Sequence, residues 1–163
     1  MWPRHILELA ETVLAGARAK GLMLATAESC TGGMVAGALT AIAGSSDVFE
    51  RGFVTYTNDA KIEDLDVPAS TIETHGAVSE QTVRAMAQGA LDYSNAEVSV
   101  AITGIAGPGG GTAEKPVGLV HFAAAREGRE TIAVAHHFGD IGRAEVRMAS
   151  VEVALNLLRR LIA

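Results

Sequence analysis

The chain alternates apolar runs with amphipathic stretches of helical period. Residues from about Pro3 to Lys20 place apolar side chains on one helical face, and Gly21 closes this predicted helix. The apolar run at about 22–27 predicts a strand. After a polar turn at Ser29, an alanine-rich run predicts a helix from about Thr31 to Ala43. The rest of the chain is organised around this strand, turn and helix.

The same alternation continues to the end of the chain. A second strand is expected at 52–56, followed by a short helix that Thr57 or Asn58 caps and that carries Lys61. The later elements are expected to be an irregular stretch between Pro68 and Gly76, a helix opened by Ser79, a strand at Val98–Thr103, a glycine-rich loop at Gly104–Pro116, strands at about Val117–Ala125 and Thr131–Phe138, and a last helix opened by Asp140.

This order predicts an α/β fold, namely a three-layer α/β/α sandwich with a mixed, mostly parallel sheet of about five strands. A polar turn joins the last two strands, which are therefore expected to form an antiparallel hairpin. Ser29 follows the first strand, Tyr56 ends the second and Gly104 follows the third. In open α/β sheets, ligands bind at the carboxyl ends of the strands, so these three residues are expected to lie near one site.

Composition narrows the class of protein. The 163 residues are expected to form a single domain, and the one cysteine, Cys30, excludes an intramolecular disulfide. A net charge of −6 with three lysines argues against nucleic acid as the main partner. No leader peptide opens the sequence and no apolar run approaches the roughly 20 residues of a membrane span, so a cytoplasmic protein is expected. The oligomeric state is left open, a homo-oligomer included.

Ser29 is the first candidate for chemistry. At a strand-to-helix turn its hydroxyl would lie beside the unpaired N–H groups of the following helix, which is half of an acyl-transfer site. Cys30, Thr31, Gly32 and Gly33 would then line the substrate site. The alternative interpretation is a capping serine followed by glycines that permit tight packing.

A serine nucleophile needs a base, and Lys61 is the best candidate. No Ser-x-x-Lys motif is present, so a serine–lysine pair must form in space. Lys61 would lie in the first turn of a helix and would be partly buried, and both conditions would lower its pKa. A neutral amine can then accept the proton of Ser29. Tyr56 could relay that proton. The alternative interpretation of Lys61 is a solvated surface lysine, and that of Tyr56 is a tyrosine at the edge of the core.

Cys30 competes with Ser29 as the nucleophile. A thiol is intrinsically more nucleophilic than a hydroxyl, and a helix N-terminus would activate it. Against this, Cys30 directly follows Ser29 in the turn, so its side chain is expected to point away from the site. Cysteines are also more often small buried side chains than nucleophiles. The histidines show no metal-ligand spacing, so neither a metal nor another cofactor is expected.

The glycine-rich loop could hold an anion. Its backbone N–H groups can approach a phosphate or carboxylate, although the loop is neither a Walker motif nor a G-x-G-x-x-G motif. Arg143, at the start of the last helix, could add a bidentate phosphate contact, or it could be an ordinary exposed arginine. The substrate-binding residues expected in this region are Thr103, Gly104, Gly107, Gly110 and Arg143.

Together these segments resemble the CinA C-terminal domain family, whose activity is nicotinamide-nucleotide amidohydrolase. The matching residues are Ala-Glu-Ser-Cys-Thr-Gly-Gly at 27–33, Ala-Gly-Ser-Ser at 43–46, Arg-Gly-Phe-Val-Thr-Tyr at 51–56 with Asn58 and Lys61, His-Gly-Ala-Val-Ser at 75–79, Thr-Gly-Ile-Ala-Gly-Pro at 103–108 with Gly110, and Lys-Pro-Val-Gly at 115–118. They span nearly the whole chain in order, which makes the resemblance highly specific.

The resemblance implies a metal-independent serine–lysine amidase that needs no cofactor. Ser29 would be the nucleophile, Lys61 the base and Tyr56 the proton relay. The substrate would be nicotinamide mononucleotide, in pyridine nucleotide salvage, and the chain would be the stand-alone form of the family. Members often carry Gly-Asp-Arg before the last helix, whereas Ile141 and Gly142 here separate Asp140 from Arg143. The alternatives are a non-catalytic nucleotide-binding module and a cysteine amidase that uses Cys30.

Overall fold

A computed structural model describes residues 1–163, which form one five-stranded sheet with helices on both faces. The elements in chain order are α1 (Arg4–Lys20), β1 (Leu24–Glu28), α2 (Met34–Thr40), the 3-10 turn η1 (Ser45–Asp47), β2 (Phe49–Val54), α3 (Asn58–Leu65), α4 (Ala69–His75), α5 (Glu80–Asp92), β3 (Val98–Gly104), β4 (Leu119–Arg126), β5 (Ile132–His137) and α6 (Arg143–Ile162).

The strand order β2-β1-β3-β4-β5 confirms the predicted mixed sheet. β1 pairs in parallel with β2 and β3, whereas β4 pairs antiparallel with both β3 and β5. Four of the five strands therefore run in one direction, and β4 is the exception. β1 and β3 are buried on both faces, as expected of strands that are covered by helices.

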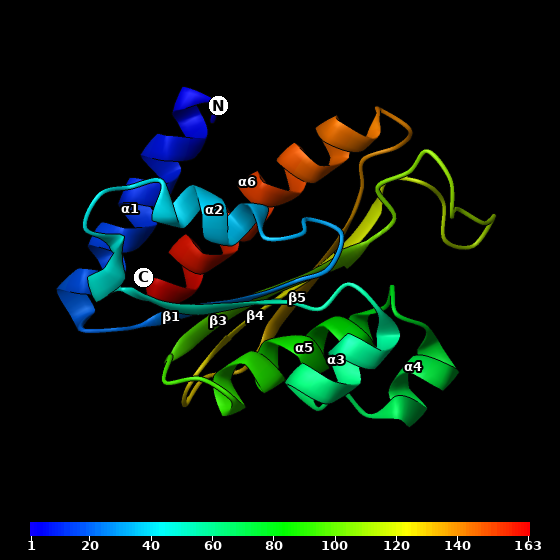
Figure 1. Ribbon diagram of the computed structural model, residues 1–163, viewed down its shortest axis with the longest axis horizontal. Coiled ribbons are helices and arrows are strands. Elements are labelled where there is room, and N and C mark those ends of the chain that lie inside the picture. The colour runs from blue at the N-terminus through cyan, green and yellow to red at the C-terminus, as the bar shows by residue number, and fades with distance from the viewer.

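The helices form the two outer layers of the predicted sandwich (Figure 1). α1, α2 and α6 cover one face of the sheet, and α3, α4 and α5 cover the other. The core under α6 is built from large aliphatic side chains, whereas the face under α5 carries many alanines, so α5 packs close to the sheet. None of the helices has both the length and the apolar character that crossing a membrane requires.

The starts of two helices differ from the sequence-based expectations, and one further helix was not expected. α2 begins at Met34 rather than near Thr31, because Gly32 and Gly33 adopt positive φ angles of 56° and 99°, which a right-handed helix does not accept. The stretch expected to be irregular after Pro68 contains the short helix α4. α6 begins at Arg143 and not at Asp140, because Gly142 lies at φ 104° and ends the preceding loop.

Candidate active site

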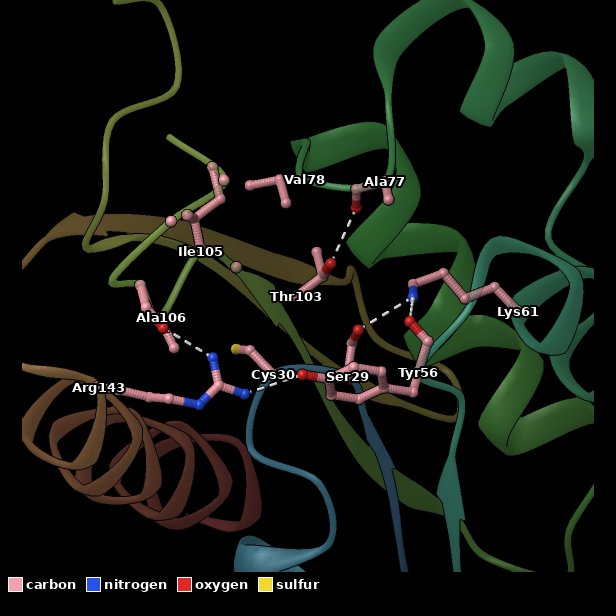
Figure 2. Close-up of a pocket in the computed structure, with 14 residues that line it drawn as sticks. Ser29, Cys30, Tyr56, Lys61, Ala77, Val78, Thr103, Ile105, Ala106 and Arg143 are labelled. Atoms are coloured by element: carbon pink, nitrogen blue, oxygen red, sulfur yellow. Dashed lines mark hydrogen bonds between the residues drawn. The ribbon is translucent and has the colours of Figure 1, made fainter. Parts of the chain in front are cut away.

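A cavity of about 270 Å³ opens at the carboxyl ends of β1 and β3. Ser29 projects into it directly after β1, and Lys61 reaches it from α3 (Figure 2). Its walls come from the loop before α3, the loop before α5, the glycine-rich loop after β3 and the first residue of α6. The expectation that Ser29, Tyr56 and Gly104 lie at one sheet edge is therefore confirmed. The remaining predicted residues that line the cavity are Cys30, Thr103, Gly107, Gly110 and Arg143.

Lys61 donates a hydrogen bond to Ser29. The Lys61 Nζ to Ser29 Oγ distance is 3.0 Å, and the same Nζ lies 2.8 Å and 3.3 Å from the backbone carbonyl oxygens of Thr55 and Tyr56. Thr57 caps α3 by accepting a hydrogen bond from the Ala60 N–H, which fixes the first turn of the helix that carries Lys61. The sequence has no Ser-x-x-Lys motif, so a serine–lysine pair could form only through folding, and the structure contains this pair.

The environment of Lys61 shifts its protonation equilibrium toward the neutral amine. Its side chain is among the largest fully buried ones, with 1% of the residue exposed. This burial lowers the pKa of Lys61 from 10.5 to about 8. A neutral amine has two N–H groups and one lone pair. When its N–H groups donate to the carbonyls of Thr55 and Tyr56, its lone pair faces Ser29. The arrangement is that of a general base aimed at a hydroxyl.

Cys30 lines the same cavity, so the expectation that it points elsewhere is wrong. It lies beside Ser29 in Figure 2. Its residue is 5% exposed, and burial raises the pKa of the Cys30 thiol to about 11. Because the thiolate is the nucleophilic form, this environment leaves Cys30 weakly reactive near neutral pH.

The N-terminus of α2 does not face the cavity, contrary to expectation. The buried carboxylate of Glu28 accepts the N–H groups of Val35 and Ala36, at 2.8 Å and 3.1 Å, and so occupies the first turn of α2. It also accepts the hydroxyl of Thr31 at 2.6 Å. Burial raises the pKa of Glu28, and these hydrogen bonds oppose that shift. The free donors near Ser29 must therefore come from groups other than the N-terminus of α2.

Two cavity-lining residues supply such donors. The N–H group of Cys30 donates to no backbone carbonyl. Gly104 stands opposite Val120 across β3 and β4, and the next residue, Ile105, donates to Leu119. Since N–H groups alternate in direction along a strand, the Gly104 N–H points away from β4 and toward the end of β1. The N–H groups of Cys30 and Gly104 are therefore candidate donors in the cavity that Ser29 lines.

The side chain of Tyr56 is not placed as a relay to Lys61. Only the backbone carbonyl of Tyr56 contacts Lys61, whereas the phenol oxygen accepts a hydrogen bond from Arg143 Nη2 at 2.9 Å. Tyr56 is 57% exposed, and Arg143 Nη1 also donates to the Gly107 carbonyl at 2.8 Å. Figure 2 shows the Arg143 guanidinium reaching across the cavity to the Tyr56 hydroxyl. The pair links α6, the glycine-rich loop and the loop before α3.

Three predicted substrate-binding residues lie outside the cavity lining. Thr31 is fully buried against Glu28, and Gly32 and Gly33 form the turn behind it. The sequence analysis missed five residues that line the cavity, namely Ala77, Val78, Ile105, Ala106 and Gly109. All five belong to the segments 75–79 and 103–110. Both segments carry the family resemblance, and that resemblance was the available signal.

The loop before α5 is fixed to the sheet by Thr103. Its hydroxyl donates to the Ala77 carbonyl at 2.9 Å, so the residue next to Gly104 holds one wall of the cavity in place (Figure 2). Lys115, near the end of the glycine-rich loop, donates to the carbonyl of His75 from the other side. These contacts join two loops that are distant in sequence into one rim.

Comparison with known proteins identifies the family. The sequence model of the CinA C-terminal domain matches residues 6–162, and the chain belongs to this family. It is 48% identical over 161 residues to the nicotinamide-nucleotide amidohydrolase PncC of Enterobacter agglomerans, with 98% of this chain and 97% of that protein covered. By its name, that relative is a hydrolase that acts on an amide bond.

Two further relatives show how this chain compares with family members in structure and in length. The crystal structure of the competence/damage inducible protein CihA from Agrobacterium tumefaciens matches with a TM-score of 0.98 and 55% identity, covering 100% of this chain and 99% of that chain. A CinA-like protein of Parasynechococcus marenigrum (strain WH8102) is 52% identical over 154 residues, which is 93% of this chain. The chain spans 36% of the length of that relative.

The burial of Lys61 predicts a specific dependence of stability on pH. Below a pH of about 8 the folded protein holds a charged, buried amine, and between about 8 and 10.5 the unfolded chain binds more protons at this site. The contribution of Lys61 to stability should therefore rise by about 3 kcal/mol across this window as the pH rises. It is the difference between wild type and Lys61→Met, because the raised pKa of Cys30 acts in the opposite direction in both proteins. Lys61→Met should be the more stable protein at pH 7 and should lose this gain. Urea unfolding at several pH values gives the free energy of unfolding of each protein, and Lys115→Met is the control. The same dependence of this free energy on pH in wild type, Lys61→Met and Lys115→Met would contradict the account.

Proposed function

We propose that residues 1–163 act as one amidohydrolase domain that converts nicotinamide mononucleotide to nicotinic acid mononucleotide and ammonia, in pyridine nucleotide salvage. The observation that carries the proposal is the buried Lys61 Nζ to Ser29 Oγ contact of 3.0 Å in a cavity at the sheet edge. The match to the amidohydrolase PncC over nearly its whole length supports the choice of substrate.

The first half of the proposed reaction acylates Ser29. Neutral Lys61 takes the proton from Ser29 Oγ, and the oxygen attacks the carboxamide carbon of the substrate. Negative charge develops on the carboxamide oxygen, which the N–H groups of Cys30 and Gly104 would stabilise. The carbon–nitrogen bond then breaks, and the proton held by Lys61 passes to the leaving nitrogen. Ammonia leaves and an ester on Ser29 remains.

The second half hydrolyses this ester. Lys61, neutral again, takes a proton from a water molecule, whose oxygen attacks the ester carbon through a second oxyanion. The bond to Ser29 Oγ breaks, Lys61 returns the proton to that oxygen, and nicotinic acid mononucleotide leaves. The two carbonyls that accept from Lys61 keep its amine aimed at Ser29 in both halves. This alternation requires a lysine that changes protonation state near neutral pH, and a pKa of about 8 meets that requirement.

We infer that Arg143 binds the phosphate of the substrate. Its guanidinium lines the cavity, and its two hydrogen bonds go to the uncharged oxygens of Tyr56 and Gly107 rather than to a carboxylate. Its positive charge is therefore available to an anion, and guanidinium binds phosphate well. Gly107 and Gly110, both at positive φ, allow the loop backbone to approach the same group. We assign Tyr56 to holding Arg143.

The serine–lysine mechanism predicts distinct effects of three substitutions on ammonia release from nicotinamide mononucleotide. Ser29→Ala should lower kcat by at least about 1,000-fold, because the nucleophile is lost. Lys61→Met should lower it by about 100-fold to 10,000-fold, because the base is lost. Cys30→Ala should keep most of the activity, since only the backbone of Cys30 takes part. The assay uses purified protein with a chelator present, and free nicotinamide serves as the comparison substrate.

The competing functions give different patterns in this assay. A cysteine amidase would lose activity in Cys30→Ala and keep it in Ser29→Ala. A non-catalytic nucleotide-binding module would bind nicotinamide mononucleotide without releasing ammonia in any of the four proteins. Either pattern would contradict the proposal.

The assignment of Arg143 and Tyr56 to binding predicts changes in KM. Arg143→Gln should raise KM for nicotinamide mononucleotide by about 10-fold to 100-fold, the range for one charged hydrogen-bonding group. Nicotinamide riboside, which lacks the phosphate, is the control substrate, and its KM should not change. Tyr56→Phe should raise KM less and leave kcat nearly unchanged. A fall in kcat of about 100-fold or more in Tyr56→Phe would instead indicate a proton relay.

A further inference from the structure

Glu28 is a buried carboxylate that the proposed mechanism does not use. It is the last residue of β1, it is 0% exposed, and no cationic side chain is among its hydrogen-bond partners. Side chains alternate along a strand, so Glu28 points to the sheet face opposite that of Ser29. Taking a carboxylate out of water without a cation is unfavourable, which calls for a reason beyond packing.

The contacts of Glu28 bracket the turn that carries Ser29. Through its backbone Glu28 ends β1, and through its carboxylate it holds the Thr31 hydroxyl and the first N–H groups of α2 at Val35 and Ala36. One residue thus ties the strand before the turn to the helix after it. This tie constrains the length and direction of the five-residue segment from Ser29 to Gly33.

Arg147 of α6 holds the same turn from outside. Its Nε donates to the Cys30 carbonyl at 3.1 Å and its Nη2 to the Thr31 carbonyl at 3.4 Å. With the carbonyls of Cys30 and Thr31 fixed by Arg147, the peptide planes of the turn are set. The N–H group of Cys30 is left without a carbonyl partner beside Ser29. The turn is held from its interior by Glu28 and from its surface by Arg147.

We propose that Glu28 is a positioning residue, whose carboxylate fixes the turn so that the Ser29 hydroxyl and the Cys30 N–H keep the geometry that acyl transfer needs. The inference rests on the proposed amidohydrolase function. A misplacement of about 1 Å in a reacting group can cost about 100-fold in rate. A residue that acted only as a helix cap would change stability and leave the turnover of the folded enzyme unchanged.

Two substitutions at Glu28 separate these roles. Glu28→Gln keeps an oxygen that can accept from Thr31 and Val35, but its amide NH₂ would face the N–H of Ala36. Glu28→Ala removes every contact. The expected kcat for nicotinamide mononucleotide falls by about 10-fold in Glu28→Gln and about 100-fold in Glu28→Ala, with KM changed by less than about threefold. Circular dichroism and thermal unfolding establish that the assayed protein is folded.

Glu97→Gln is the matched control. The Glu97 carboxylate accepts the N–H of Met23 at 2.8 Å, just before the opposite end of β1, so this variant makes the same carboxylate-to-amide change at a backbone contact far from the cavity. Its kcat should equal that of wild type. Three results would overturn the inference and leave the proposed function intact. They are a wild-type kcat in folded Glu28→Ala, a Glu28 variant in which only KM rises, and a loss of kcat in Glu97→Gln equal to that in Glu28→Gln. An inactive wild-type protein would contradict the proposed function and this inference with it.

Discussion

The site depends on the burial of one amine beside one hydroxyl. Lys61 projects from α3 and is buried, and this burial lowers its pKa while three oxygen atoms fix the direction of its amine. The surrounding fold serves this contact. Thr57 caps α3, and Gly89 of α5 has no side chain where the Leu65 carbonyl at the end of α3 approaches, so α3 can lie close against α5 and present Lys61 to the sheet.

The contact between Lys61 and Ser29 also requires a rigid turn on the other side. A serine at the end of a buried strand can meet a lysine from a neighbouring helix only if the chain reverses tightly and reproducibly. Two glycines at positive φ permit the reversal, and Glu28 and Arg147 define it from opposite sides. The protein thus keeps two unfavourable buried groups, an amine and a carboxylate, at the ends of neighbouring elements. Natural proteins commonly retain such strain at functional sites.

Much of this could be predicted from the sequence. Periodicity predicted each strand and the long helices, and the rule that ligands bind at the carboxyl ends of strands correctly grouped Ser29, Tyr56 and Gly104. Side-chain direction could not be predicted. Whether Cys30 faces the cavity, and whether the phenol of Tyr56 meets Lys61 or Arg143, depends on turn geometry and on contacts made across more than eighty residues. The start of α2 was misplaced because a positive φ at two glycines is a tertiary requirement that local helix propensity does not contain.

The protonation of Lys61 is the most direct test of this account. The chain has only three lysines, so ¹³C-labelled lysine should give three assignable side-chain signals, from Lys20, Lys61 and Lys115. Titration by NMR should show one signal with a midpoint near pH 8, and that signal should be absent from Lys61→Met. If the Lys61 signal instead titrates at the ordinary value of 10.5, almost none of the amine is neutral near pH 7, and Lys61 cannot serve as the base for Ser29.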